Sequence, residues 1–589
     1  MSAPAADRPA TEATGPATPS PVTPPVERGR SIEPRVFWPA AAVIAVFALL
    51  ALVFPGATAE AMSGVQGVVL AGFGWYYVLL IAAFVVFSGF VAFSRYGDLR
   101  LGRDDEAPEF GLRSWFAMLF SAGMGIGLVF WGVAEPLNHF AAPRPGFDGT
   151  QAQAGAQAIT TTYLHWGVHA WAIYVVVGLA IAYAVHRKGR PISIRWAIEP
   201  LVGEKVARGR FGDVIDVIAV VGTLFGVATS LGFGVLQLSA GLDFLGLPAN
   251  TPLWQTVLIA AITGLAVLSV VTGVAKGIRI LSNVNMVLAA LVLLFVLLAG
   301  PTLFLLREFV ASLGLYAANV LRLTFDTSPL QGEAGQAWQA SWTTFYWGWW
   351  MSWAPFVGVF IARISRGRTV REFVVGVLAV PTLLTFLWFS VLGGTALYRE
   401  LFGEGGLVGA EGAVDTNTSL FLMLDGLPFG AVVSVVALVL IVTFFVTSSD
   451  SGSLVVDMLA SGGNTNPPTW SRVMWAVLEG VVAAALLIVG AVTGATSGLS
   501  ALQTTAIVIA LPFSFVMIMM MVATLRAFRE EWAEVDHRRR RRRTKRLAAD
   551  VAAELENDGR VDGLGPDDHP GSVAAGARTP AGTGPRERP

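Results

Sequence analysis

The stretch Ser121-Ala-Gly-Met-Gly-Ile-Gly127 places three glycines at alternate positions inside an otherwise apolar run. Glycine has a low helix propensity, so a membrane helix is expected to unwind here and to leave backbone carbonyls available to a ligand. Close packing of neighbouring helices through small residues is the alternative explanation of the same glycines. The stretch therefore predicts either a broken membrane helix that lines a binding site or a tight helix contact.

The composition around this stretch is that of an integral membrane protein. Of 589 residues, 54% are hydrophobic and 14% are charged, a balance that a water-soluble chain of this length does not carry. The chain has no cysteine, which excludes disulfides and thiolate metal sites. Apolar runs of about 20 residues, long enough to cross the hydrocarbon core as helices, predict an all-α fold with twelve spans that begin near residues 36, 75, 113, 158, 212, 253, 285, 340, 373, 430, 470 and 502.

Basic residues predict the orientation of these spans. Lys and Arg gather in every second connecting segment, at residues 95–113, 187–210, 276–279 and 363–371, and again after the last span. The positive-inside rule places these segments and both termini in the cytoplasm, with the chain in the inner membrane of a bacterium. The first 35 residues are rich in proline and have no apolar core, so we expect a disordered cytoplasmic tail.

Glycines are also expected to break the helical run of the eighth predicted span, at Gly348 and Gly358, five spans after the first glycine stretch. An odd spacing makes the two spans run in opposite directions, which is typical of an inverted repeat with a substrate site near the midplane. The predicted divisions are a disordered tail (1–35), two extra spans (36–112), a first repeat (113–306), an interfacial connection (307–339), a second repeat (340–528), a basic C-terminal helix (529–560) and a disordered tail (561–589).

Spans four and eight are unusually rich in aromatic residues. They read Trp166-Gly-Val-His-Ala-Trp171-Ala-Ile-Tyr174 and Trp347-Gly-Trp349-Trp350-Met-Ser-Trp353. An aromatic belt at the membrane interface would explain one or two of these rings, but not all of them. Facing rings can instead hold a quaternary ammonium by cation–π contacts worth about 2 kcal/mol each when desolvated. The pattern favours a cage for a methylated cation.

The stretch Phe345-Tyr-Trp-Gly-Trp-Trp-Met-Ser-Trp-Ala-Pro-Phe-Val-Gly-Val-Phe-Ile-Ala-Arg-Ile-Ser-Arg-Gly-Arg368 resembles the signature of the betaine/choline/carnitine transporter family. The resemblance covers about residues 36–530, and the sodium-coupled glycine betaine carriers are nearest. It implies a LeuT-like core of five plus five helices. The substrate-binding residues it implies are an aromatic box of Trp166, Trp171, Tyr174 and Trp350, then Trp353, Met124, Gly123, Gly125 and Gly127 toward the carboxylate end, and Trp349 on the access path.

The same resemblance implies a coupling sodium ion. Its ligands would come from Ser121, Met124, Phe444, Thr447 and Ser448. Hydrogen bonding of the two hydroxyls to the preceding helical turn is the alternative role for Thr447 and Ser448. A second sodium site of the family is matched by Thr223 and Phe356, but Val227 stands where another threonine is expected. An isopropyl group offers no ligand oxygen, so transport with one sodium ion is the alternative.

Other polar residues of the spans bear on substrate and ion. Choline carriers of the family place an acid in the glycine stretch, where this chain has Gly127, so a cage without a buried acid favours a zwitterion. His165 and His169 are spaced as metal ligands, but no carboxylate or third histidine lies nearby in sequence, which disfavours a metal site. Asp216 and Glu479 are candidates for proton transfer or, more simply, for internal hydrogen bonds.

A dense basic segment follows the last span. Its members are Arg538, Arg539, Arg540, Arg541, Arg542, Arg543, Lys545 and Arg546. Such residues anchor a chain at anionic lipid, and screening of their charge by salt is a route to osmotic regulation. Both roles are predictions for this segment.

Taken together, these patterns predict a secondary carrier and not an enzyme. The prediction is sodium symport of glycine betaine or a related trimethylammonium solute by alternating access, with no nucleic-acid partner. The family resemblance, and not the sequence pattern, implies a homotrimer. A proton-coupled choline or carnitine transporter of the same fold is one alternative. A membrane sensor that binds betaine without moving it is another.

Overall fold

The computed structural model describes residues 32–123, 125–272, 275–492 and 499–557. Within these ranges the chain is helical and forms no β-strand. The longer helices are α1 (Pro34–Val53), α2 (Pro55–Phe93), α3 (Leu112–Gly123), α4 (Ile126–Ala141), α5 (Gln151–Trp166), α6 (Val168–Ala182), α10 (Arg210–Phe244), α11 (Pro252–Thr272), α12 (Ala275–Ala299), α13 (Thr302–Thr324), α15 (Phe345–Arg363), α16 (Val370–Phe402), α18 (Gly430–Ala460), α19 (Thr469–Val492) and α20 (Leu499–Asn557). The shorter segments are η1 (Arg95–Asp98), η2 (Tyr183–Arg187), α7 (Ile194–Ala197), α8 (Glu199–Val202), α9 (Glu204–Ala207), η3 (Pro329–Gln331), α14 (Gly332–Gln339), η4 (Ala340–Thr344) and α17 (Ser419–Asp425).

Eleven described helices are long and apolar enough to cross a membrane, and the bent pair α3 and α4 brings the number to twelve. The all-α membrane fold is therefore confirmed. The set differs from the predicted spans in two members: α13 belongs to it, whereas α15, the predicted eighth span, is not among the eleven. The predicted connection 307–339 thus contains most of an apolar helix, followed by η3 and α14. Its interfacial position stays a prediction.

Helix α2 begins at Pro55, about twenty residues before the predicted start of the second span. Residues 55–74 contain five glycines, so hydropathy alone did not predict that this segment is helical. Proline is well tolerated in the first turn, where its missing N–H is not needed. Contacts with α20 hold the helix: Thr504 Oγ1 donates to Gln66 Oε1 at 3.0 Å, and Tyr77 Oη donates to the carbonyl of Ile507 at 2.7 Å.

The buried centre of the bundle is built from α5, α6, α10 and α15, and the periphery includes α11, α12 and α13. In the most apolar window of residues 151–187, 89% of residues are buried, compared with 17% in the window of α13. Large apolar side chains such as Leu253 and Val310 lie exposed on the peripheral helices. Helices that are apolar on every face fit a lipid environment. The structure thus separates a packed core from a lipid-facing shell.

The glycines of the eighth span do not break it, which corrects one prediction. Helix α15 is continuous, and its glycines are contact points. A Cβ built at Gly348 would lie 2.9 Å from the Ala506 carbonyl oxygen, and one at Gly358 would lie 2.6 Å from Val177 Cγ1. The small-residue packing explanation is therefore the correct one here, because neighbouring backbones approach where a side chain would not fit.

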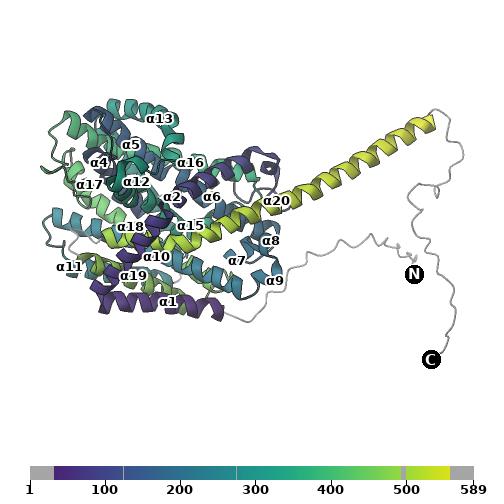
Figure 1. The fold of residues 1–589 in the computed structure, drawn as a ribbon, viewed down its shortest axis with the longest axis horizontal. Helices are drawn as coiled ribbons and strands as arrows, with labels where there is room; N and C mark the ends of the chain where they lie inside the picture. Colours follow the sequence, from purple (N-terminus) through teal and green to yellow (C-terminus); the bar gives the residue numbers. More distant parts are fainter. Residues whose placement is uncertain (1–31, 124, 273–274, 493–498, 558–589) are drawn as a thin grey trace, which may run out of the picture.

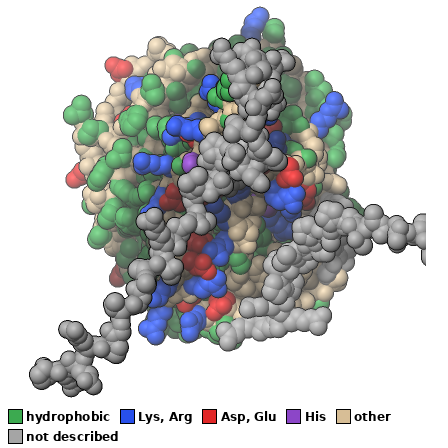
Figure 2. Space-filling model, turned by 90° about the vertical axis from the view of Figure 1, so that its right-hand side faces the viewer, with side chains coloured by type: hydrophobic (Ala, Val, Ile, Leu, Met, Phe, Trp, Pro, Cys, Tyr) green, Lys and Arg blue, Asp and Glu red, His purple; other side chains and the backbone are tan. Residues whose placement is uncertain are grey.

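One end of the bundle carries α7, α8 and α9 and is the end from which α20 extends; α4, α5, α13 and α17 lie toward the opposite end (Figure 1). We call these the α20 end and the distal end. Lys, Arg, Asp and Glu side chains gather on the face at the α20 end (Figure 2). Ion pairs join the connecting segments there: Arg366 Nε to Glu106 Oε1 at 2.6 Å and Lys188 Nζ to Glu531 Oε2 at 3.1 Å. The second of these contacts fastens the base of the projecting helix to the bundle.

Candidate functional site

The first glycine stretch separates α3 from α4. The two helices are bent by 66° at this break, as the glycines predict. Gly125 is the N-cap of α4 and has an extended backbone (φ −163°). Met124 lies outside the described residues, and the burial of Gly123 is not described either. The broken span leaves Ser121 on one side of the bend and Gly127 on the other.

Gly127 lies directly against the aromatic residues of two other spans. A Cβ built there would stand 2.5 Å from Trp349 Cη2 and 3.1 Å from Trp166 Cη2. No side chain, and certainly no acid, fits at this position without displacing an indole. The structure therefore brings the glycine stretch and the aromatic residues together, as the sequence analysis predicts for a shared site.

The four predicted box residues converge from two spans. Trp166 ends α5, Gly167 interrupts the helix, and Trp171 and Tyr174 follow on α6. A Cβ at Gly167 would lie 2.6 Å from Phe386 Cε1, so only glycine allows this break. The Trp166 and Trp350 ring centroids are 4.8 Å apart at 72°, the Trp171 and Tyr174 centroids 5.3 Å at 75°, and the Tyr174 and Trp350 centroids 6.4 Å at 74°.

The box is packed and anchored by hydrogen bonds. All four rings are buried, and Trp350 Nε1 donates to the carbonyl of His165 at 2.8 Å. Trp349 stacks on Trp350 with centroids 4.5 Å apart. Edge-to-face and offset rings of this kind present a negative π-face to a cation. Trp353 stands apart, since it lines a separate cavity.

A buried carboxylate adjoins the box, and sequence reasoning missed it. Glu135 of α4 accepts hydrogen bonds from Trp166 Nε1 at 2.6 Å and from the hydroxyl of Tyr346. His165 Nδ1 lies 2.7 Å and His139 Nε2 lies 3.3 Å from Glu135 Oε1. The sequence has no carboxylate or third histidine close to His165 along the chain, but the fold brings Glu135 and His139 next to it. His169 is not part of this cluster and bonds instead to Thr324 Oγ1 at 2.7 Å.

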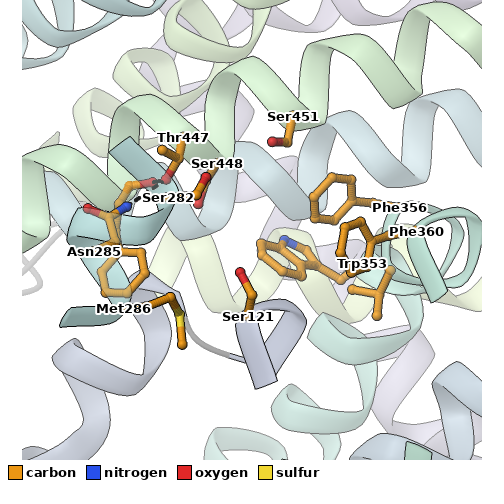
Figure 3. A pocket seen from close by; sticks show the side chains of 12 residues that line it. Ser121, Ser282, Asn285, Met286, Trp353, Phe356, Phe360, Thr447, Ser448 and Ser451 are labelled. Atoms are coloured by element: carbon orange, nitrogen blue, oxygen red, sulfur yellow. Dashed lines mark hydrogen bonds between the residues drawn. The ribbon is translucent and has the colours of Figure 1, made fainter. Parts of the chain in front are cut away.

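A cavity of about 130 Å³ contains most of the predicted sodium ligands (Figure 3). Its lining includes Ser121, Phe444, Thr447 and Ser448, joined by Trp353, Phe356 and residues of α12. The cavity lies toward the α20 end, because its lining extends to Phe360, one turn before the end of α15. Hydroxyl oxygens from α3 and α18 thus face one space, as the resemblance implies.

Asn285 of α12 is a member of this cavity that sequence reasoning did not identify. It is 2% exposed, and its Nδ2 donates to Thr447 Oγ1 at 3.0 Å. Its Oδ1 has no partner among the described residues. Thr447 also donates to the Thr443 carbonyl at 3.0 Å, so the alternative role of its hydroxyl is present as well. An asparagine inside an apolar span was the signal that could have revealed this residue.

The comparisons with known proteins agree with this geometry. Residues 35–533 match the betaine/carnitine/choline family of transporters. This chain belongs to that family. An uncharacterized transporter of Mycobacterium tuberculosis is 54% identical over 506 residues, covering 85% of this chain and 84% of that protein. The glycine betaine transporter OpuD of Bacillus subtilis is 46% identical over 501 residues, 85% and 95% of the two chains. Glycine betaine transporter 1 of Vibrio parahaemolyticus is 42% identical over 511 residues, again 85% and 95%.

The two residues matched to a second sodium site lie in different surroundings in this member of the family. Phe356 lines the cavity described above, but Thr223 is not among the described residues that line it. The Thr223 hydroxyl donates to the Ala219 carbonyl at 2.7 Å, within its own helix. Val227 is fully buried, and its methyl groups lie 3.1 Å from a Cβ built at Gly452. Position 227 therefore offers no side-chain oxygen.

Two other buried acids of this family member have structural partners. Asp216 accepts from Ser193 Oγ at 2.6 Å and from the Arg195 backbone N–H at 3.0 Å, which ties α10 to the start of α7. Glu479 accepts from Ser449 Oγ at 2.9 Å. Both contacts fit the simpler of the two expectations, an internal hydrogen bond.

The distal side of the box is closed by packing and an ion pair. Trp342 lies 4.4 Å from His139 and 5.6 Å from Trp131, measured between ring centroids. Farther out, Arg144 Nη1 pairs with Asp326 Oδ2 at 2.7 Å. The side chains of this pair are 11% and 23% exposed. Aromatic rings and an ion pair therefore pack on the distal side of the box in this conformation.

The basic segment of the tail continues α20 away from the bundle (Figure 1). The side chains of residues 540–546 are exposed, and Arg540 pairs with Asp536 at 2.9 Å. The surroundings of Arg538 and Arg539 lie outside the described side chains, and the predicted tail 561–589 lies outside the described residues. The helical character of the segment to Asn557 agrees with the predicted basic helix.

Proposed function

We propose that this transporter imports glycine betaine or a related trimethylammonium solute by sodium symport. The observation that carries the proposal is the set of ring contacts that joins Trp166, Trp350, Tyr174 and Trp171 beside the glycine stretch. Relatives that cover most of the chain are named glycine betaine transporters, which supports the same substrate. Rings without an ionised group among them suit a cation that cannot lose its charge.

The transport cycle we propose is alternating access on a LeuT-like inverted repeat. The 66° bend at the glycine stretch supports this core. In the conformation described, packing closes the distal side of the box and a cavity lies toward the α20 end. If charged segments mark the cytoplasmic side, as the positive-inside rule states, the cavity faces the cytoplasm. Both termini are then cytoplasmic, and the membrane is a bacterial inner membrane.

Sodium is the coupling ion in this proposal. Serine and threonine hydroxyls and the Asn285 amide oxygen, which surround the cavity, are hard ligands of the kind that small cations prefer. Ligands from α3 and α18 would make the ion join the two repeats. The valine at position 227 supports a stoichiometry of one sodium ion.

Regulation and assembly are further parts of the proposal. The exposed basic residues of α20 would bind anionic lipid and respond to salt, so that osmotic stress changes activity. The base of this helix is joined through Glu531 to Arg187 and Lys188, which directly follow the span that carries the box. A homotrimer, as the family resemblance implies, could use exposed apolar residues of α13 such as Val310 and Leu321.

One observation favours a second candidate substrate. Glu135 is a buried acid whose hydrogen-bond partner Trp166 belongs to the box. The argument against choline was the absence of such an acid, so choline or carnitine transport, coupled to protons, remains the second candidate.

The test is uptake by the full chain in proteoliposomes. Glycine betaine, choline, carnitine and proline are offered with and without a sodium gradient, and a proton uncoupler is added with the sodium gradient held constant. We expect betaine uptake that needs sodium and survives the uncoupler. Uptake that is independent of sodium or abolished by the uncoupler would reject sodium symport, and solute binding without uptake would indicate a sensor.

The box itself is tested by Trp350→Leu. Loss of one desolvated cation–π contact of about 2 kcal/mol corresponds to a Kd about 30-fold higher. Trp254→Leu is the matched control, because Trp254 is 47% exposed at the periphery in α11. An unchanged betaine affinity in Trp350→Leu would show that the substrate binds elsewhere.

A further inference from the structure

Glu135 is the most completely hydrogen-bonded buried acid next to the box. Its side chain is fully buried, and one of its oxygens faces His165 and His139 while the other faces Trp166 and Tyr346. Four polar groups use the lone pairs of both oxygens, as an ionised carboxylate requires. In the part of the chain that the structure describes, no Lys or Arg forms an ion pair with it.

The cluster of Glu135, His139 and His165 also has the composition of a metal site, with ligand atoms all within 4.8 Å of one another. The distances between the ring nitrogens and the carboxylate oxygen, however, are those of hydrogen bonds. Tetrahedral ligands about 2.1 Å from a zinc ion stand about 3.4 Å apart, whereas His165 Nδ1 and Glu135 Oε1 are 2.7 Å apart. A proton between these two atoms explains the distance, and a metal ion does not.

The His165 ring can be assigned from its two partners. Its Nε2 lies 3.1 Å from Thr343 Oγ1, which can donate, and its Nδ1 faces the carboxylate. A neutral ring with the proton on Nδ1 satisfies both contacts. His139 can likewise donate from Nε2, while its Nδ1 has no partner among the described residues. With both histidines neutral, no positively charged side chain among the described residues neutralises an ionised Glu135.

Trp166 connects this charge to the box. Its Nε1–H points to Glu135, and its ring faces Trp350, with centroids 4.8 Å apart. An anion at the edge of an indole adds to the negative potential at its face, since the edge carries the positive part of the quadrupole. In a buried site, little solvent screens this effect. A cation held by the ring therefore gains from a carboxylate that it does not touch.

We propose that Glu135 is a positioning and specificity-determining residue that supplies, through Trp166, the counter-charge for a quaternary ammonium in the box. Gly127 has no room for an acid, so the glycine stretch cannot supply the negative charge. Glu135 supplies it instead, at the edge of the Trp166 indole. The inference rests on the proposed binding of a trimethylammonium group in the box. It extends the substrate class to cations that bring no carboxylate of their own, because the protein holds a negative charge for them.

The experiment compares a charged ligand with an uncharged one of the same shape. Glycine betaine and 3,3-dimethylbutyrate differ only in a nitrogen or a carbon atom at the branching centre. Their Kd values are measured by calorimetry on the purified full chain, and their ratio gives the charge preference. We expect wild-type protein to bind betaine more tightly than 3,3-dimethylbutyrate. The ratio of the two Kd values should shrink at least tenfold in Glu135→Gln and stay close to the wild-type ratio in Glu135→Asp.

Matched controls separate charge from packing. Glu479→Gln changes another fully buried acid, whose hydrogen-bond donor is Ser449, and should leave the ratio unchanged. Loss of packing alone would weaken both ligands equally and leave the ratio of Glu135→Gln at the wild-type value, which would overturn the inference. If wild-type protein binds both ligands equally, the proposed box itself is rejected. Failure of the Glu135 role and failure of the box therefore give different results.

A second pair of variants keeps the test decisive if Glu135 variants do not fold. Trp166→Phe retains an aromatic ring and removes the Nε1–H bond to Glu135. Trp388→Phe is its control, because that buried indole donates to the Leu128 carbonyl at 2.8 Å. We expect the charge preference to fall at least fivefold in Trp166→Phe and to stay unchanged in Trp388→Phe. Equal ratios in the two variants would contradict the role of Glu135.

Discussion

The two ends of the bundle differ in how they surround the aromatic box. Toward the distal end, rings and a hydrogen-bonded acid pack against the box: Trp131 and Glu135 are fully or almost fully buried, and Trp342 is partly buried. Toward the α20 end, a cavity of about 130 Å³ is lined by small hydroxyl side chains and Asn285. Close-packed aromatic groups leave no path for solute, whereas short polar side chains leave room for ions and water. The two ends therefore differ in the side chains beside the box, which are large and aromatic at one end and small and polar at the other.

The strongest test of this difference uses single cysteines, because the chain has none of its own. Ser451 lines the cavity and is partly exposed, while Ala134 of α4 is fully buried in the distal half. We expect a small thiol reagent to react at Ser451→Cys about a hundredfold faster than at Ala134→Cys, since a buried thiol reacts only after local opening. Equal rates in detergent-purified protein would show that the two halves are equally accessible.

The next largest effect concerns the point where the glycine stretch contacts the box. Gly127→Ala would place a Cβ 2.5 Å from Trp349, and the indole must move. We expect betaine affinity to fall at least about tenfold, in line with the cost of overpacking. Gly264→Ala is the control, because no described residue lies within 4 Å of its built Cβ and it is exposed in the peripheral helix α11. Similar affinities for the two variants would show that this contact does not shape the box.

The hollow side is tested through sodium dependence. Thr447→Ala removes a hydroxyl from the cavity, and we expect the sodium concentration for half-maximal betaine uptake to rise about fivefold to tenfold. Thr443→Ala removes a hydroxyl one turn earlier, which bonds to the Val439 carbonyl and does not line the cavity. If both variants keep the wild-type sodium response, the ion does not bind in this cavity.

The smallest effect is expected at the distal ion pair. Arg144→Ala removes the contact with Asp326, and a partly exposed pair of this kind contributes about 1 kcal/mol. We expect reaction at Ala134→Cys to become about fivefold faster, because the closed state is favoured less. Arg322→Ala is the control, since that residue bonds within the exposed end of α13. A rate that does not change would show that ring packing alone closes this side.

The sequence was informative wherever a property is local. Hydropathy located most spans, and the glycine stretch predicted the bend between α3 and α4. The aromatic density of two spans, with the family resemblance, predicted the box residues that the structure brings together. It was misleading for the glycines of α15, because a glycine that unwinds a helix and one that lets a neighbour approach look the same in sequence.

Sequence alone determined that this chain is a bundle of membrane helices, since the length and apolar character of each span are properties of that span. Tertiary structure decided which polar groups meet inside it. Glu135 is 31 residues from Trp166 and 211 from Tyr346, and Asn285 is 162 residues from Thr447. No spacing rule connects residues so far apart. Their meeting follows from how the helices pack, because a buried polar group needs a partner and the fold alone determines which one lies within reach.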